Sequence, residues 1–341
     1  MRSFAIGVDL GGTNLRVAVV DDDGQPLEVA SQATNLARGR EHVVGEISRA
    51  VRRLAPKFSS SHRWLGIGVG VPGIIDLESG TVDAAANLPG WGDYPVRGEL
   101  ESQLGVRVFL ENDANCAALG EKWIGAGRDV DDLCMLTLGT GVGGGFVVNG
   151  RPWHGVTGMA GELGHMTVIA DGAACGCGSR GCLEQYASAT AIKRMALENA
   201  VAAAAAAEGQ SSGLAQAANR LGAEFSAEAV YECAQLGDPA AKAIFETVGR
   251  ALGIALGNLI NALNLPLYVV GGGVAKAWNE FSPALMRELK NRSIVFRAGE
   301  PRKSQHRSTM IARTILAENA GLLGAARLPM LERESRCSLA V

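Results

Sequence analysis

The sequence predicts an α/β protein built from two related lobes with a cleft between them. Residues 4–9 and 15–20 have strand patterns on either side of a glycine turn, and a second strand–turn–strand unit of this kind begins at Cys134. Helical and strand patterns alternate between these units, as is typical of α/β architecture. The 341 residues are enough for one large or two medium-sized domains with hydrophobic cores.

The first lobe is expected to start as a β-meander, because a second turn signal at Asp21-Asp22-Asp23-Gly24 is followed by another extended run. Apolar residues at helical spacing then predict a helix, and two apolar runs predict buried strands. A further helix opens at Glu111-Asn112-Asp113 and continues to Trp123. The expected ranges are a helix at 41–56 and strands at 64–71 and 106–110.

The second half is expected to be mainly helical. Asn149-Gly150 is a strong hairpin signal, and the alanine-rich segment 197–210 is typical of a helix on a surface insertion. The other expected elements are strands at 134–138, 146–148 and 267–270 and helices at 251–263 and about 312–327. We expect residues 1–113 with about 310–328 to form a small lobe, residues 114–309 a large lobe, and residues 329–341 a flexible tail.

Composition and charge exclude several classes of protein. The formal net charge is −3, so the sequence gives no electrostatic reason to expect nucleic acid or an anionic membrane as partner. The N-terminus enters a strand pattern without a signal peptide, and asparagines and Pro266 interrupt the apolar stretch 251–275. We therefore expect a cytoplasmic protein with a buried helix and strand in this stretch, and reduced thiols.

Three glycine loops follow apolar strand patterns, at residues 9–14, 138–145 and 270–273. Glycine turns present converging backbone N–H groups to a phosphate without side-chain obstruction. Asp9 at the first turn would bind Mg²⁺ through water, or would merely cap the turn. The candidate phosphate- and nucleotide-binding residues are Asp9, Gly11, Gly12, Thr13, Asn14, Gly139, Thr140, Gly141, Gly272 and Gly273.

The second loop also matches the dinucleotide-binding fingerprint, with glycines at 139, 141 and 144. That fingerprint requires a helix after the loop, whereas this loop is followed by the strand pattern at 146–148 and the Asn149-Gly150 turn. A Walker A lysine is absent as well. The sequence therefore favours phosphates held by hairpin turns.

Asp113 is the candidate catalytic residue. One interpretation of Glu111-Asn112-Asp113 is a helix N-cap, since Asn and Asp accept hydrogen bonds from the first N–H groups of a helix. The other is a general base, because phosphoryl transfer to a sugar hydroxyl needs an acceptor for the hydroxyl proton. Three phosphate-type loops in the same chain favour the base, with Asn112 orienting the sugar.

His165, Cys175, Cys177 and Cys182 have the types and spacing of zinc ligands. Three sulfurs and one imidazole form a closed tetrahedral set that leaves no position for water, which is typical of a structural site. The alternative is three unlinked thiols beside an unrelated histidine. A metal here would fix Glu162 and Glu184, whose carboxylates can bind a polyol.

With these residues, the sequence resembles the ROK family of sugar kinases, sugar-responsive repressors and uncharacterised relatives. The likeness covers about residues 4–328, and the His165 and cysteine motifs together are highly specific to the family. The motifs are Asp9-Leu-Gly-Gly-Thr-Asn14, Gly70-Val-Pro-Gly73, Asn87-Leu-Pro-Gly-Trp91, Glu111-Asn-Asp-Ala-Asn115, Leu138-Gly-Thr-Gly-Val-Gly-Gly-Gly145, Gly161-Glu-Leu-Gly-His165 and Cys175-Gly-Cys-Gly-Ser-Arg-Gly-Cys-Leu-Glu184.

The resemblance implies an actin-like (ribonuclease-H-like) fold whose lobes close over ATP and a sugar, with Mg²⁺ and a structural Zn²⁺. It implies that Asp113 is the base and that His165 and the three cysteines bind zinc. By the same resemblance, Asn87, Asn112, Glu162, His165, Glu184 and the backbone of Gly73 contact the sugar, Thr13, Thr140 and Gly141 contact phosphate, and Gly272 and Gly273 lie near the adenosine. Homodimers or homotetramers are expected.

Within the family, residues 182–188 are similar to the glucokinase branch, which implies transfer of the γ-phosphoryl group of ATP to the 6-hydroxyl of glucose. N-acetylmannosamine or N-acetylglucosamine kinase is the alternative, and polyphosphate is an alternative donor. A sugar-sensing repressor is disfavoured, because family repressors carry a DNA-binding domain ahead of the first strand. The sequence departs from the family at Leu267, where an acidic residue is common, and in the long 197–210 segment.

Overall fold

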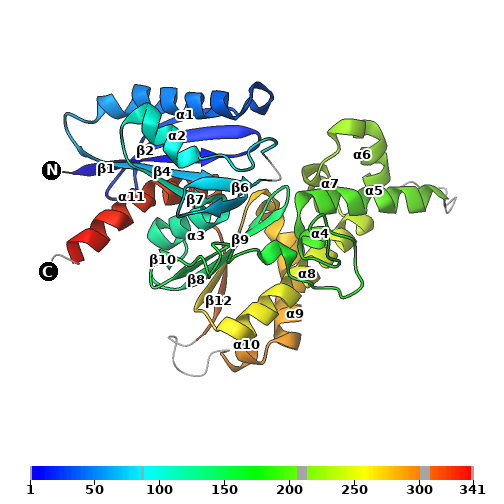
Figure 1. Ribbon diagram of the computed structural model, residues 1–341. Coiled ribbons are helices and arrows are strands. Elements are labelled where there is room, and N and C mark those ends of the chain that lie inside the picture. Colours follow the sequence, from blue (N-terminus) through cyan, green and yellow to red (C-terminus); the bar gives the residue numbers. More distant parts are fainter. Residues whose placement is uncertain (1, 86–87, 206–212, 300–307, 339–341) are drawn as a thin grey trace. The chain divides into compact units, whose positions relative to one another are not determined.

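The computed structural model describes residues 2–85, 88–205, 213–299 and 308–338. The chain forms two compact units (Figure 1). Unit 1 comprises Met1–Met135, Gly145–Gly161 and Thr314–Val341, and unit 2 comprises Leu136–Gly144 and Glu162–Arg313. Residues 114–135, which continue the helix that begins at Asp113, and residues 145–161 group with unit 1, although they were expected in the large lobe.

Unit 1 is built on a five-stranded sheet with the order β3-β2-β1-β4-β7. The first three strands form the predicted antiparallel meander, and β4 and β7 extend the sheet in parallel. The strands are β1 (Ser3–Leu10), β2 (Asn14–Asp21), β3 (Pro26–Ala33), β4 (Arg63–Val71) and β7 (Val108–Asn112), and a separate hairpin joins β5 (Ile74–Asp76) to β6 (Thr81–Ala84).

Helices cover both faces of this sheet, as Figure 1 shows. Because side chains alternate along a strand, Val17 and Val19 of β2 lie in the core with α1 (Arg40–Leu54) and α2 (Val96–Leu104), whereas Ala18 and Val20 pack against α11 (Ala320–Ser338). The α3 helix (Asp113–Ile124) lies on the α11 side as well. Unit 1 thus has three layers, and α3, which follows β7 in the chain, lies in the same layer as α11.

Two glycines allow α11 to approach closely. A Cβ atom added at Gly68 of β4 would lie 1.8 Å from the carbonyl oxygen of Ala325, and one added at Gly324 would lie 1.7 Å from that of Cys116 in α3. Real side chains do not fit at such distances, so the backbones themselves form this interface.

The carboxylate of Glu121 in α3 is fully buried and accepts hydrogen bonds from a ring of donors. Its oxygens accept from the backbone N–H groups of Ala126 at 2.7 Å, Ile315 at 3.1 Å and Leu316 at 2.9 Å, and from the hydroxyl of Thr314. Glu121 therefore fixes the segment that leads into α11.

We expect Glu121→Ala to lower the free energy of unfolding by about 2–5 kcal/mol, because several buried donors lose their acceptor at once. Glu41→Ala, at an exposed position of α1, should leave the free energy of unfolding nearly unchanged. Urea unfolding of both variants measures the difference. Equal stabilities would mean that the buried carboxylate contributes nothing.

The second sheet has the order β10-β9-β8-β11-β12, with β8 (Leu133–Leu138), β9 (Val142–Val148), β10 (Arg151–Pro152), β11 (Leu267–Gly271) and β12 (Met310–Arg313). Asn149 and Gly150 both have positive φ angles, 51° and 74°, as the predicted hairpin turn requires. The helices of unit 2 are α4 (Glu184–Ala187), α5 (Ala189–Ala205), α6 (Gly213–Leu221), α7 (Ala227–Gln235), α8 (Pro239–Leu263), α9 (Trp278–Arg292) and α10 (Ile294–Ala298).

Helix α8 is long and apolar enough to cross a membrane by length and composition, but 67% of its apolar window is buried inside the protein. Its glycine face packs on α9, since a Cβ atom added at Gly249 would lie 2.1 Å from the carbonyl oxygen of Phe281. The predicted buried helix followed by a buried strand, β11, is therefore confirmed.

The C-terminal elements differ from the prediction. A helix was expected from about residue 312, but Met310–Arg313 is strand β12, which pairs in parallel with β11. Helix α11 then begins at Ala320 and continues to Ser338, where a flexible tail was expected. The buried side chain of Met330 and the 2.8 Å ion pair between Arg327 and Glu334 hold this last part of the helix.

Candidate active site

Three strand ends in unit 1 bring the first group of predicted residues together. The parallel register aligns Asp9 of β1 with Gly70 of β4, and Gly70 with Glu111 of β7. Asp113 follows immediately as the first residue of α3. These carboxylates share the carboxyl end of the sheet, which is where ligands bind in open α/β sheets.

Asn112 is the N-cap of α3, and Asp113 is not. The Oδ1 of Asn112 accepts from the backbone N–H groups of Ala114 at 2.9 Å and Asn115 at 3.2 Å, and its Nδ2 donates to the carbonyl oxygen of Gly73 at 3.2 Å. The Asp113 carboxylate accepts from Ala114 N–H at 2.8 Å. Asn112 therefore joins the start of α3 to the Gly73 turn and holds the Asp113 backbone.

Gly73 occupies a position that other residues do not tolerate. Its φ angle is +109°, and an added Cβ atom would lie 2.2 Å from the carbonyl oxygen of Ala84. Asn87, the other predicted sugar contact on this side of the chain, lies outside the described residues.

Asp9 and the first glycine turn form the second part of the unit 1 site. The Gly11 N–H donates to the Asn14 carbonyl oxygen at 2.9 Å, and the Thr34 hydroxyl donates to the Gly11 carbonyl oxygen at 2.8 Å. Burial raises the pKa of Asp9, and the charge of Arg16 on the paired strand opposes this shift. A divalent cation would offset the burial cost of an ionised Asp9.

Glu111 and His154 form a pair that the sequence did not predict. The His154 Nε2 lies 2.6 Å from the Glu111 Oε2, and the Glu111 side chain is only 4% exposed. The hydrogen bond to Glu111 raises the pKa of His154, and burial opposes it. The two residues are 43 positions apart, so no local pattern joins them.

In unit 2 the second glycine loop forms part of a cavity of about 350 Å³. The loop is folded by a 2.9 Å hydrogen bond from Gly139 N–H to the Gly141 carbonyl oxygen, and it continues into β9 rather than into a helix. The cavity is lined by Gly139 and Thr140 of this loop, by Gly273, and by Tyr231 and Phe245 on α7 and α8. Phosphate-type turns and aromatic side chains thus face the same space.

Gly272 precedes the cavity residue Gly273, and its position in the fold requires a glycine. Its φ angle is +85°, and an added Cβ atom would lie 2.4 Å from the Leu138 carbonyl oxygen. Ser226, Glu228 and Lys276 also line the cavity, and sequence analysis missed them. They come from the start of α7 and from a short 3-10 helix (Gly273–Ala277), neither of which carries a motif.

Glu184 is bonded directly to the glycine loop. Its Oε2 accepts from the backbone N–H of Val142 at 3.0 Å, and an added Cβ atom at Gly141 would lie 2.3 Å from the same oxygen. The Thr190 hydroxyl also donates to the Thr140 carbonyl oxygen at 2.8 Å. The helix start that carries Glu184 and the candidate phosphate loop are therefore one connected piece.

His165, Cys175, Cys177 and Cys182 form the predicted cluster, and their ligand atoms all lie within 4.8 Å of one another. The His165 Nδ1 lies 3.6 Å from the Cys175 Sγ, and the Cys177 Sγ lies 3.7 Å from the Cys182 Sγ. On its other side, the His165 Nε2 is 3.8 Å from the Glu162 carboxylate. A histidine that binds a metal commonly has such a carboxylate at its second nitrogen.

The thiols of this cluster need a cation to ionise together. Burial raises the pKa of Cys182 to about 12, and the neighbouring Cys175 and Cys177 add to this shift, whereas the Ser179 backbone lowers the pKa of Cys177. A bound divalent metal deprotonates coordinating thiols and removes their mutual repulsion. The donor set, spacing and charge therefore fit Zn²⁺.

The predicted residues fall into two groups. Unit 2 holds the sugar candidates Glu162, His165 and Glu184, the nucleotide candidates Gly139, Thr140, Gly141, Gly272 and Gly273, and the four metal ligands. Unit 1 holds Asp9, Gly11, Gly12, Thr13, Asn14, Gly73, Asn112 and Asp113. Unit 1 therefore contains the candidate base and the first glycine turn, and unit 2 contains the other nucleotide candidates, three sugar candidates and the metal ligands.

The chain is similar to known proteins over nearly its whole length. The chain is 38% identical over 332 residues to a glucokinase of Halalkalibacterium halodurans, which covers 97% of this chain and 96% of that protein. The ROK hexokinase from Thermus thermophilus has a TM-score of 0.76 and 33% identity, covering 98% of this chain and 100% of that chain.

A ROK family glucokinase from Streptomyces griseus, solved in complex with glucose and AMPPNP, has a TM-score of 0.75 and 33% identity, covering 96% of this chain and 99% of that chain. These likenesses confirm the expected actin-like α/β fold. The ROK family model matches residues 5–330. This chain belongs to the ROK family.

Proposed function

We propose that this protein is an ATP-dependent glucokinase that transfers the γ-phosphoryl group of ATP to the 6-hydroxyl of glucose. The observation that carries the proposal is the 3.0 Å hydrogen bond between Val142 N–H and the Glu184 carboxylate. It joins a nucleotide-sized cavity with a glycine loop to a carboxylate that can accept hydrogen bonds from a polyol. The glucokinases similar to this chain support the same substrate.

In the proposed reaction, the 6-hydroxyl oxygen of glucose forms a bond to the γ-phosphorus of ATP. The bond from that phosphorus to the bridging oxygen breaks, and ADP leaves. Asp113 accepts the hydroxyl proton, so that the attacking oxygen does not carry a positive charge. Asn112 contributes by holding Asp113 at the start of α3.

ATP is the proposed donor rather than polyphosphate. The unit 2 cavity has aromatic wall residues, Tyr231 and Phe245, in addition to the glycine loop. The purine and ribose of ATP can pack against these aromatic side chains, whereas polyphosphate has no base or sugar to bury there. Mg²⁺, held through water by Asp9, would neutralise charge on the phosphates.

The His165 and cysteine cluster is the proposed structural zinc site. Glu184 follows Cys182 by two residues, and the Gln185 N–H donates to the Cys182 carbonyl oxygen at 2.9 Å. Zinc bound here would therefore fix the backbone at Glu184, while Glu162 lies beside His165. We assign sugar binding in unit 2 to Glu162, His165 and Glu184.

Glu184 gives a direct test of this assignment. If its carboxylate accepts from neighbouring sugar hydroxyls, 2-deoxyglucose should have a kcat/KM about 10- to 100-fold below that of glucose, because a buried acceptor loses its donor. Glu184→Ala should raise the KM for glucose and reduce this difference. It should also raise the KM for ATP, since Val142 loses its acceptor.

A matched variant separates these two effects. Glu184→Gln keeps a side-chain oxygen for the Val142 N–H but loses the charge, so it should affect glucose and spare ATP. Steady-state kinetics with both sugars measures the outcome, and Glu198→Ala on the exposed face of α5 is the control. If the ratio of kcat/KM for glucose to kcat/KM for 2-deoxyglucose is the same in Glu184→Ala as in the wild type, Glu184 does not contact the sugar.

A further inference from the structure

His154 has no role in glucose or ATP binding as assigned above, yet its side chain contacts Glu111 on the strand that ends one residue before the candidate base. It follows β10, and its carbonyl oxygen accepts from Ala160 N–H at 3.0 Å. Its Nε2 lies 2.6 Å from the Glu111 Oε2 on β7. The His154 side chain is 32% exposed, so its proton exchanges with solvent, whereas Glu111 is buried.

The other oxygen of Glu111 accepts hydrogen bonds from residues at the start of α3. Its Oε1 accepts from the Asn112 backbone N–H at 2.9 Å and from the Asn115 Nδ2 at 3.0 Å. Asn115 is buried, and its Oδ1 has no hydrogen-bond partner among the described residues, so Glu111 fixes this amide. Two Glu111 bonds therefore flank Asp113 on both sides in the sequence.

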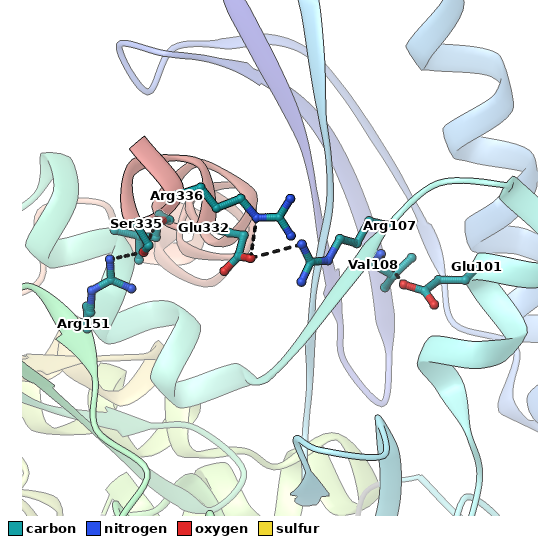
Figure 2. A network of polar contacts seen from close by, with 8 residues as sticks. Glu101, Arg107, Val108, Arg151, Glu332, Ser335 and Arg336 are labelled. Atoms are coloured by element: carbon teal, nitrogen blue, oxygen red, sulfur yellow. Dashed lines mark hydrogen bonds and ion pairs between the residues drawn. The ribbon is translucent and has the colours of Figure 1, made fainter. Parts of the chain in front are cut away.

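His154 and Glu111 also line a cavity of about 530 Å³ in unit 1. Figure 2 shows that two of the arginines that line it are paired with residues of α11: Arg107 pairs with Glu332, which also pairs with Arg336, and Arg151 bonds to Ser335. Glu101 accepts from Val108 N–H at 2.9 Å. The other charged residues that line this cavity are Arg97 and Glu101 of α2, Arg107 beside β7, Arg151 of β10 and Glu332 of α11. Helix α3, which also packs on β10, carries Asp113, Glu121 and Lys122.

We propose that His154 is a positioning residue for phosphoryl transfer, which acts through Glu111 to hold the Asn112–Asp113 junction in its reactive geometry. The inference rests on the proposed role of Asp113 as base. A rigid junction matters because displacement of a reacting group by about 1 Å can cost about 100-fold in rate. Because His154 can gain or lose a proton, the geometry of this junction should also depend on pH.

The sign of the pH effect follows from the raised pKa of His154. The ion pair is complete below that pKa and is lost as pH rises through it. Neutral imidazole with its proton on Nε2 still donates to Glu111, so deprotonation should have a smaller effect than removal of the ring. We expect kcat of the wild type to fall about threefold on the alkaline side.

Two substitutions of His154 distinguish positioning from simple structural support. His154→Leu removes the donor, and we expect kcat to fall about 10- to 100-fold with the KM values for glucose and ATP within about threefold of the wild type. His154→Gln keeps an N–H donor that does not titrate, so it should recover most of kcat and lose the alkaline fall. His62→Gln, at a partly exposed histidine of unit 1 that pairs with Ser61, is the control.

A second readout does not depend on turnover. In ¹H–¹⁵N NMR spectra, the backbone amides of Asn112 and Asp113 should titrate with the pKa of the His154 ring, and this titration should vanish in His154→Gln. The proposal is wrong if the chemical shifts of these amides do not change as His154 titrates. It is also wrong if a folded His154→Leu enzyme has the kcat of the wild type. Failure of the wild type to phosphorylate glucose would instead refute the proposed function, while the NMR titration still tests the coupling.

Discussion

Asp113→Asn is expected to lower kcat for glucose by about 10²–10⁴-fold, the usual contribution of a positioned general base. An asparagine has nearly the same shape, and its side-chain oxygen can keep the 2.8 Å bond to the Ala114 N–H. It cannot accept the proton of the sugar hydroxyl. The variant should therefore fold and bind glucose while turnover is lost.

The measurement is steady-state turnover combined with glucose binding by calorimetry. Asp129→Asn is a matched control, because Asp129 is 88% exposed in the same unit and should leave kcat unchanged. If Asp113→Asn turns over glucose within a few-fold of the wild type, Asp113 serves only the start of α3 and the proposed mechanism is wrong.

Cys177→Ser should remove zinc and weaken glucose binding by about 100-fold or more, although no cysteine is assigned to the sugar. The physical reason is the short connection from the cluster to Glu184. Gly181 illustrates how tightly the loop is folded, since its φ angle is +70° and an added Cβ atom would lie 1.6 Å from the Ile169 carbonyl oxygen. Without a metal, the crowded thiols lose the coordinate bonds that would join the two ends of this loop to His165, and only hydrogen bonds such as that from Gly181 N–H to the Ala173 carbonyl oxygen remain to hold it.

Metal analysis and calorimetry test this prediction. The wild type should contain about one zinc per chain, a closed Cys₃His set being typical of structural sites. Cys233→Ser, in α7 and outside the cluster, should keep both zinc and glucose binding. A fully active preparation without zinc would contradict the assignment.

The sequence predicted those parts of the fold that depend on local patterns. The meander, the Asn149-Gly150 hairpin and the helix that opens after Asn112 are each encoded in a few adjacent residues. The glycine loops and the cysteine cluster were found for the same reason. Strand β12 was missed, because its four residues become a strand only by pairing with β11, more than forty residues earlier.

The residues that sequence analysis missed are held by contacts between distant segments. Glu121 looks like a surface residue of an amphipathic helix, but its partners at 314–316 lie almost 200 positions away. His154 carries no motif, and its contact with Glu111, 43 positions earlier, exists only in the folded chain. A buried carboxylate can be identified only when the donors that compensate it are known.

The most direct test of glucokinase activity is identification of the product. The protein should be incubated with Mg²⁺, ATP and an equimolar mixture of glucose, N-acetylglucosamine and N-acetylmannosamine, and the products followed by ³¹P NMR. We predict that ADP and glucose 6-phosphate appear together in equal amounts and ahead of any other sugar phosphate. Faster formation of an acetamido sugar phosphate, or ADP without any sugar phosphate, would contradict the assignment.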